Sequence, residues 1–244
     1  MIVAANWKMN PDLATGSRLV MEYAASKYPT ITRVLFAPHP YLVPVGVRLQ
    51  DSGIILGAQD CHAKDDGAHT GDVAAHMLAS CGAQMVLLGH SERRSDHHES
   101  NAEIQAKART ALAAGLDIMI CIGEQESDRE QGIAIDVVTA QLVGSLPDDV
   151  PAARLTIAYE PVWAIGTGKV AGVDDISEIH DTIRETLVQR GLAGVSILYG
   201  GSVKPDNAAA IFAIDNVGGA LVGGASLDAE QFASICHAAS ISAE

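Results

Sequence analysis

The residue of this chain best suited to acid–base chemistry is Glu160, which follows a run of apolar residues and directly precedes Pro161. The apolar run from Leu155 predicts a buried strand, so Glu160 is expected at the carboxyl end of that strand. Pro161 and Trp163, followed by Gly166 and Gly168, then predict a loop whose first hinge is stiff. Loops that close over a substrate exclude water and complete a catalytic site. The pattern therefore indicates a general base beneath a closing loop.

Other chemically useful residues also stand at the ends of short apolar runs. They lie in the segments 6–8, 90–94, 121–124, 199–202 and 223–226. Lys8 offers a fixed positive charge and His90 a proton carrier, and glycine-rich tips that open a helix bind phosphate through backbone N–H groups. A base, an acid and a phosphate site predict proton abstraction beside a carbonyl in a phosphorylated substrate.

The elements that must position these residues alternate through the whole chain. Apolar runs predict strands at 2–7, 31–37, 54–58, 84–89, 117–123, 155–160, 195–200 and 216–222. Amphipathic segments predict helices at 12–28, 41–51, 73–81, 101–115, 126–146, 174–191, 204–214 and 227–239. Such alternation is typical of βαβ units in a parallel sheet.

Eight βαβ-like units without a break in composition favour an α/β fold of one kind, a closed (β/α)8 barrel, over an open doubly wound sheet. We expect a single domain spanning residues 1–244. In such a barrel the carboxyl ends of all strands share one rim. The chemically useful segments, although scattered in sequence, are therefore expected to converge in space.

The bulk properties limit the partners and the compartment. A net charge of −14 argues against nucleic acid and anionic membranes, which select basic surfaces. The four cysteines are far apart, which is typical of a reducing compartment. The chain begins without a signal-peptide pattern, and no apolar run reaches the roughly 20 residues that span a bilayer. We expect a cytoplasmic protein with no membrane and no nucleic-acid partner.

Several long motifs resemble those of the triosephosphate isomerase family, in that family's order and spacing. They are Asn6-Trp7-Lys8-Met9-Asn10, Gly89-His90-Ser91-Glu92-Arg93-Arg94, the segment 159–169, Tyr199-Gly200-Gly201-Ser202-Val203 and Leu221-Val222-Gly223-Gly224-Ala225-Ser226-Leu227. The resemblance runs from the first predicted strand to the last predicted helix. It implies a (β/α)8 barrel that isomerises a phosphorylated three-carbon sugar without a metal or cofactor.

The resemblance also implies roles for single residues. Glu160 would move a proton between C1 and C2, while His90, as a neutral imidazole, polarises the carbonyl and carries the oxygen-bound proton. Lys8 would offset the charge of the intermediate with Asn6 beside it, and Glu92 would hold Lys8 in place. Phosphate would rest on the backbone N–H groups of Gly166, Ser202, Gly223 and Gly224. From its position in the sequence, we interpret Cys121 as a small buried thiol under Glu160.

The segment 60–72 resembles the family's dimer loop, in which the position of Thr70 reaches into a partner subunit. The resemblance therefore implies a homodimer. The segment ends in Asp72 where the family usually has glutamate. A shorter carboxylate is expected to weaken the anchoring of this loop.

Alternative interpretations start from the same residues. The stretch from Gly166 to Ala171 satisfies a dinucleotide-binding pattern, but Pro161 and Trp163 stand where a tight strand-to-helix turn would be needed. A metal site at His97 and His98 is disfavoured, because adjacent helical residues project about 100° apart; we expect both to be solvated at the start of a helix. Two functional alternatives stay open: an isomerase of a four-carbon ketose phosphate, and a non-catalytic barrel scaffold.

Overall fold

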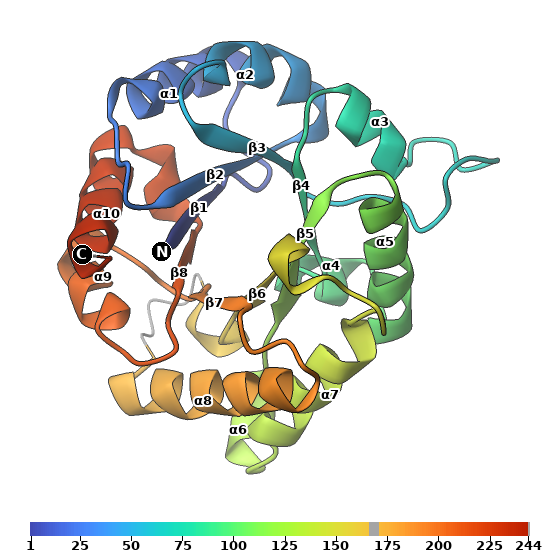
Figure 1. Cartoon of the computed structure of the whole chain (residues 1–244), viewed down its shortest axis with the longest axis vertical. Helices are drawn as coiled ribbons and strands as arrows, with labels where there is room; N and C mark the ends of the chain where they lie inside the picture. Colours follow the sequence, from blue (N-terminus) through green and yellow to red (C-terminus); the bar gives the residue numbers. More distant parts are fainter. Residues whose placement is uncertain (166–170, 244) are drawn as a thin grey trace.

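The computed structural model describes residues 1–165 and 171–243 and has the expected architecture, a closed barrel of eight parallel strands surrounded by helices (Figure 1). Each strand pairs with the next in sequence, and β8 pairs with β1 to close the ring. The strands are β1 (Ile2–Asn6), β2 (Thr32–Ala37), β3 (Ile54–Ala58), β4 (Met85–Leu88), β5 (Asp117–Ile122), β6 (Leu155–Tyr159), β7 (Ser196–Tyr199) and β8 (Gly219–Val222).

The helices fill the segments between the strands. The α-helices are α1 (Leu13–Ala25), α2 (Leu42–Leu49), α3 (Ala75–Ser80), α4 (Ser91–Asp96), α5 (Asn101–Ala113), α6 (Glu126–Glu130), α7 (Ala134–Ser145), α8 (Val173–Gln189), α9 (Pro205–Phe212) and α10 (Ala229–Ser242). Short 3-10 helices are η1 (His39–Tyr41), η2 (Ala152–Arg154), η3 (Val162–Ala164) and η4 (Gly224–Leu227). None of the helices in the described ranges is long and apolar enough to cross a membrane.

The strands present two apolar faces, because successive side chains of a strand point to opposite sides. On β1, Ala4 belongs to a cluster inside the barrel, whereas Val3 and Ala5 pack outward against the helices. The inner cluster is filled from all around the ring by Ala4, Val34, Phe36, Met85, Leu87, Met119, Cys121, Ala158, Leu198 and Leu221. The barrel interior is therefore a packed core, and we expect a ligand site at the rim, where the strands end.

Two helix predictions were wrong. The expected helix over 126–146 is two helices, α6 and α7, because Gly132 adopts a left-handed backbone with φ +71° that ends the first. A helix that we did not expect, α4, begins directly after His90, so His97 caps its C-terminal end instead of lying at a helix start. Both His97 and His98 are exposed, as expected.

Gly123 follows β5 and lets the backbone of Glu160 come very close. A Cβ atom placed on Gly123 would lie 1.7 Å from the carbonyl oxygen of Glu160, a distance that no side chain tolerates. Gln141 fixes the same residue from the helix layer, since its amide donates to the Gly123 carbonyl at 2.9 Å and accepts from its N–H at 2.8 Å. The backbone at the end of β6 is thus held by direct contact with β5.

The first prediction concerns this contact. We expect Gly123→Ala to lower the free energy of unfolding by about 1–3 kcal/mol or more, because the methyl group must displace backbone. Gly194→Ala is the matched control, since no atom lies within 4 Å of its added Cβ; its effect should stay within about 1 kcal/mol. Urea unfolding of the two variants measures both values. Equal urea midpoints for the two variants would show that the contact between Gly123 and Glu160 does not limit stability.

Candidate active site

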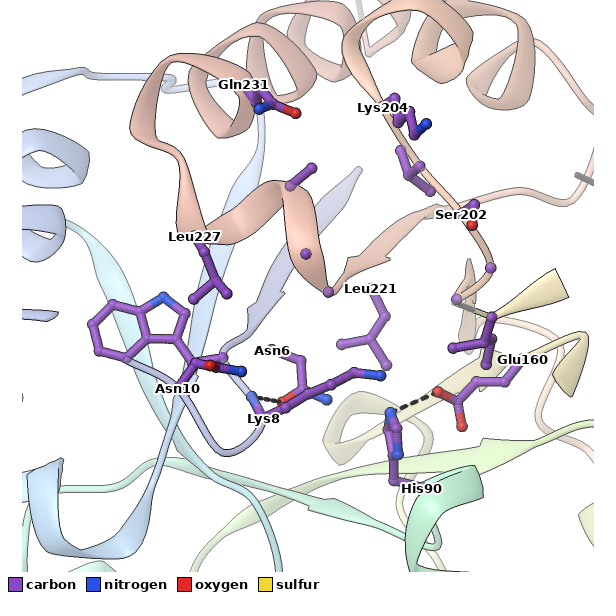
Figure 2. Close-up of a pocket in the computed structure, with 18 residues that line it drawn as sticks. Asn6, Lys8, Asn10, His90, Glu160, Ser202, Lys204, Leu221, Leu227 and Gln231 are labelled. Carbon is purple, nitrogen blue, oxygen red and sulfur yellow. Dashed lines mark hydrogen bonds and ion pairs between the residues drawn. The ribbon is translucent and has the colours of Figure 1, made fainter. Parts of the chain in front are cut away.

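The predicted site residues converge on a cavity of about 440 Å³ at the carboxyl ends of the strands (Figure 2). Those that line it are Asn6, Lys8, His90, Glu160, Ser202, Gly223 and Gly224. Glu92 stands just outside and contacts Lys8, and Cys121 is buried in the inner cluster beneath. The prediction for Gly166 concerns a residue outside the described ranges. Segments more than 200 residues apart in sequence thus share one cavity.

Glu160 is almost fully buried, with 2% of its surface exposed, and its carboxylate is bonded on both oxygens. Oε1 lies 2.9 Å from Nε2 of His90, and Oε2 accepts the backbone N–H of Ser91 at 2.9 Å. Burial raises the pKa of Glu160, but the His90 ring and the Ser91 N–H outweigh it and hold the pKa below its ordinary value. The group is therefore an anion, the form that a base requires.

His90 stands between Glu160 and the first turn of α4. Its Nδ1 accepts the backbone N–H of Glu92 at 3.3 Å, which leaves Nε2 to donate toward Glu160. Burial lowers the pKa of His90, but the adjacent Glu160 carboxylate opposes this and holds the pKa above its ordinary value. A ring nitrogen that accepts an N–H belongs to the neutral imidazole, the form that the family resemblance implies. The raised pKa has its cause in the direct contact with Glu160.

Lys8 has a strained backbone that its neighbours hold in place. Its φ of +52° is rare for a residue with a side chain and costs about 1 kcal/mol or more. The Lys8 N–H donates to Oδ1 of Asn6 at 3.0 Å, and the amide of Gln59 donates to the Lys8 carbonyl at 2.9 Å. Nζ lies 2.6 Å from Glu92. Figure 2 shows the amine aimed into the cavity toward His90 and Glu160.

Opposite these charged groups, the cavity has a wall of small residues and backbone. Gly223 and Gly224 stand where β8 passes into η4, whose first N–H groups have no partner within a helix. Ser202 lies at the neighbouring tip after β7, and its hydroxyl donates to the carbonyl of Ala164 at 3.0 Å. Glycine without a side chain lets an anion reach these N–H groups. The wall is suited to a phosphate group.

Cys121 lies beneath Glu160, as the sequence indicated. It is fully buried, and burial together with the nearby Glu160 carboxylate raises the pKa of its thiol well above the usual value. A thiol in that state is protonated and unreactive. Its function at this position is packing.

The sequence did not reveal a cluster at the first hinge of the loop that follows Glu160. The carboxylate of Glu124 is completely buried and accepts from Trp163 Nε1 at 2.7 Å, Tyr159 OH at 3.1 Å and Arg129 Nε at 2.7 Å. Arg129 also lies over the indole, 5.2 Å from the ring centroid. Glu124 stood at a predicted strand end, but only the structure identifies its partners. The hinge is anchored to β5 and α6 by this carboxylate.

Comparison with known proteins gives one consistent family. The triosephosphate isomerase family matches residues 1–239. A triosephosphate isomerase of Ruegeria sp. (strain TM1040) is 52% identical over 244 residues, covering 97% of each chain, and one of Acidiphilium cryptum (strain JF-5) is 49% identical over 251 residues, covering 98% of each. The crystal structure of triosephosphate isomerase from Bartonella henselae superposes with a TM-score of 0.91 at 40% identity, covering 97% of this chain and 98% of that one.

The pKa of His90 leads to a pH-dependent stability. A histidine whose pKa is raised in the folded protein stabilises the fold below its unfolded pKa, and this contribution is lost as pH rises through the folded pKa. We expect the advantage of the wild type over His90→Gln in unfolding free energy to shrink as the pH rises above about 6.5, the ordinary pKa of histidine. Urea unfolding of both proteins across that range measures it. A constant difference would mean that His90 stays neutral when folded.

Proposed function

The chain belongs to the triosephosphate isomerase family, and from this premise we propose how its residues carry out the isomerisation. The protein interconverts D-glyceraldehyde 3-phosphate and dihydroxyacetone phosphate, a reaction shared by glycolysis and gluconeogenesis. The observation that carries the assignment of residues is the meeting of Glu160, His90 and Lys8 in one cavity that also has a wall of exposed backbone N–H groups.

Glu160 is the base. Its carboxylate takes a proton from C1 of the ketose, and the electron pair left behind forms the C1–C2 double bond of an enediolate. The same carboxylate returns the proton to C2, which gives the aldose. The reaction transfers no electrons and consumes no net proton, so no redox cofactor is needed.

His90 and Lys8 support the charge that develops on oxygen. His90 gives a proton to the oxygen on C2 and takes one from the oxygen on C1, and Lys8 with Asn6 stabilises the enediolate electrostatically. In the substrate-free site Glu160 is bonded to His90 and to the Ser91 N–H. The substrate oxygens therefore replace Glu160 as the partner of His90, which frees the carboxylate to reach carbon.

The phosphate is held locally, against a protein field that repels anions. The net charge is −14, and Lys8 is already paired with Glu92 at 2.6 Å. We therefore assign the phosphate to the backbone N–H groups of Ser202, Gly223 and Gly224, with Gly166 as the fourth donor from the closing loop. An enediol phosphate that escapes into water eliminates phosphate. Closure of the segment 161–169 would prevent this by excluding water.

We also propose that two copies of the chain pair through the loop 60–72. In Figure 1 this loop, between β3 and α3, projects well beyond the barrel. A cavity of about 680 Å³ beside the site is lined by Asn6, Lys8, Met9, Gln59 and Glu92, and the Met9 side chain above it is 96% exposed. An exposed apolar side chain next to a groove suits a partner's loop. The chain is proposed to act as one domain, 1–244, in the cytoplasm, without nucleic acid or membrane.

The substrate is tested by rate measurements in chelator-treated buffer. We expect fast interconversion of the two triose phosphates, unchanged by the chelator and well above the rate with a four-carbon ketose phosphate. A preference for the four-carbon substrate would keep the mechanism but change the substrate. No turnover of either would favour the scaffold alternative.

The role of Glu160 is tested by withdrawing its carboxylate by one methylene. We expect Glu160→Asp to lower kcat by about 100-fold or more, because a misplacement of about 1 Å spoils proton transfer. Glu22→Asp, at an exposed position of α1, is the matched control and should leave kcat unchanged. Near-normal turnover by Glu160→Asp would remove this residue from the role of base.

A further inference from the structure

The loop between β3 and α3 gathers three metal-ligating side chains that the isomerase mechanism does not use. His62, His69 and Asp72 each offer one ligand atom, and these atoms all lie within 4.8 Å of one another. None of the three lines the catalytic cavity. His62 and Asp72 line a separate cavity of about 410 Å³. The cluster is therefore distinct from the site of the isomerisation.

The geometry of the loop holds the three side chains together. The backbone N–H of His62 donates to the Val73 carbonyl at 2.8 Å, which fastens the two ends of the loop, and the N–H of Asp72 donates to the His69 carbonyl at 3.0 Å. The two imidazole rings lie 4.2 Å apart between centroids, tilted by 38°. Nε2 of His62 lies 3.8 Å from Oδ2 of Asp72. Only small side-chain rotations would bring these atoms around one ion.

We propose that this cluster binds a divalent transition-metal ion of the Zn²⁺ class, with two imidazole nitrogens and one carboxylate oxygen as ligands. Zn²⁺ accepts such a mixed set and is usually four-coordinate, so one position is left for water. Neutral imidazole and an ionised carboxylate are the forms of these side chains that bind metal.

A hydrogen bond of His62 determines which of its two ring nitrogens is available to the metal ion. The backbone N–H of Lys64 donates to Nδ1 at 3.1 Å, so Nε2 is the nitrogen that faces Asp72. Coordination through Nε2 moves the ring proton to Nδ1, with no net proton released, and the Lys64 N–H then turns to water. That hydrogen bond is exposed, so solvent replaces it readily.

The charges around the cluster favour a cation. Asp65 and Asp66 lie exposed in the same loop. The loop 60–72 contains one lysine, Lys64, and no arginine. Across the adjoining cavity Arg93 and Lys107 carry positive charge, but both are paired with Asp60 and Glu99. Glu103 adds a further carboxylate to that cavity. The nearby positive charges are therefore neutralised within the protein.

A metal ion here would cross-link the start and the end of the loop. Such a link removes conformational freedom that the free loop would keep. The same loop is proposed to pair two chains, so the ion would fix its conformation before pairing. The metal proposal itself does not depend on the isomerase activity, because no catalytic residue belongs to the cluster.

The test is calorimetric titration of Zn²⁺ into the full chain after chelator treatment and desalting. We expect one ion per chain, with the affinity lowered at least about tenfold in His62→Ala and in His69→Ala. Asp72→Asn should also weaken binding, because the ligand charge is lost. His237→Ala, at an exposed position of α10 far along the chain, is the matched control and should bind as the wild type does.

A second measurement keeps the proposal testable if a variant is poorly folded. Co²⁺ in a site of two imidazoles and a carboxylate gives visible absorption bands, and these should appear with the wild type and disappear when Zn²⁺ is added. Unchanged titration by folded His62→Ala and His69→Ala, or loss of binding in His237→Ala alone, would overturn the proposal. Isomerase rates that stay constant during the titration would separate its outcome from that of the proposed function.

Discussion

The structure depends on one constraint, the closure of eight parallel strands into a ring. Because β8 pairs with β1 and every strand runs in the same direction, all carboxyl ends meet on one rim. The barrel interior is filled by the inner side chains, so the rim is where a ligand can be enclosed. Asn6, His90, Glu160 and Gly223 are separated by long stretches of sequence, and this closure alone brings them to one cavity.

Around the cavity, the buried carboxylates have compensating partners. Glu160 is bonded to His90 and a backbone N–H, and Glu124 to Arg129 and two further donors. An uncompensated charge at these depths would cost several kcal/mol. In the proposed mechanism the Glu160–His90 pair is also what the reaction exchanges, since substrate oxygens take over the contact with His90. The buried charges are therefore paired in the substrate-free protein, and the same groups stay available to a substrate.

Much of this could be predicted from the sequence, for identifiable reasons. Apolar runs ending in polar residues located the strands and the rim, and the motifs around His90 and Glu160 are long enough to be specific. The break at Gly132 was missed because α6 consists of five polar residues, with no buried face that could mark it as separate from α7. Helix α4 was missed because its six residues are likewise too polar to show a buried face. Contacts made by Glu124, Gln59 and Gly123 depend on the register of neighbouring strands. Composition and spacing carry no record of that register.

The pairing of β8 with β1 also affects how the chain folds during its synthesis. During synthesis β1 is made first, but its second neighbour is complete only when Val222 has been added. At roughly 5–20 residues per second, the edge of β1 waits about ten to forty seconds for its partner. An unpaired strand edge is a template for pairing with other chains. Until β8 is complete, β1 therefore presents an unpaired edge, and closure of the ring is what removes it.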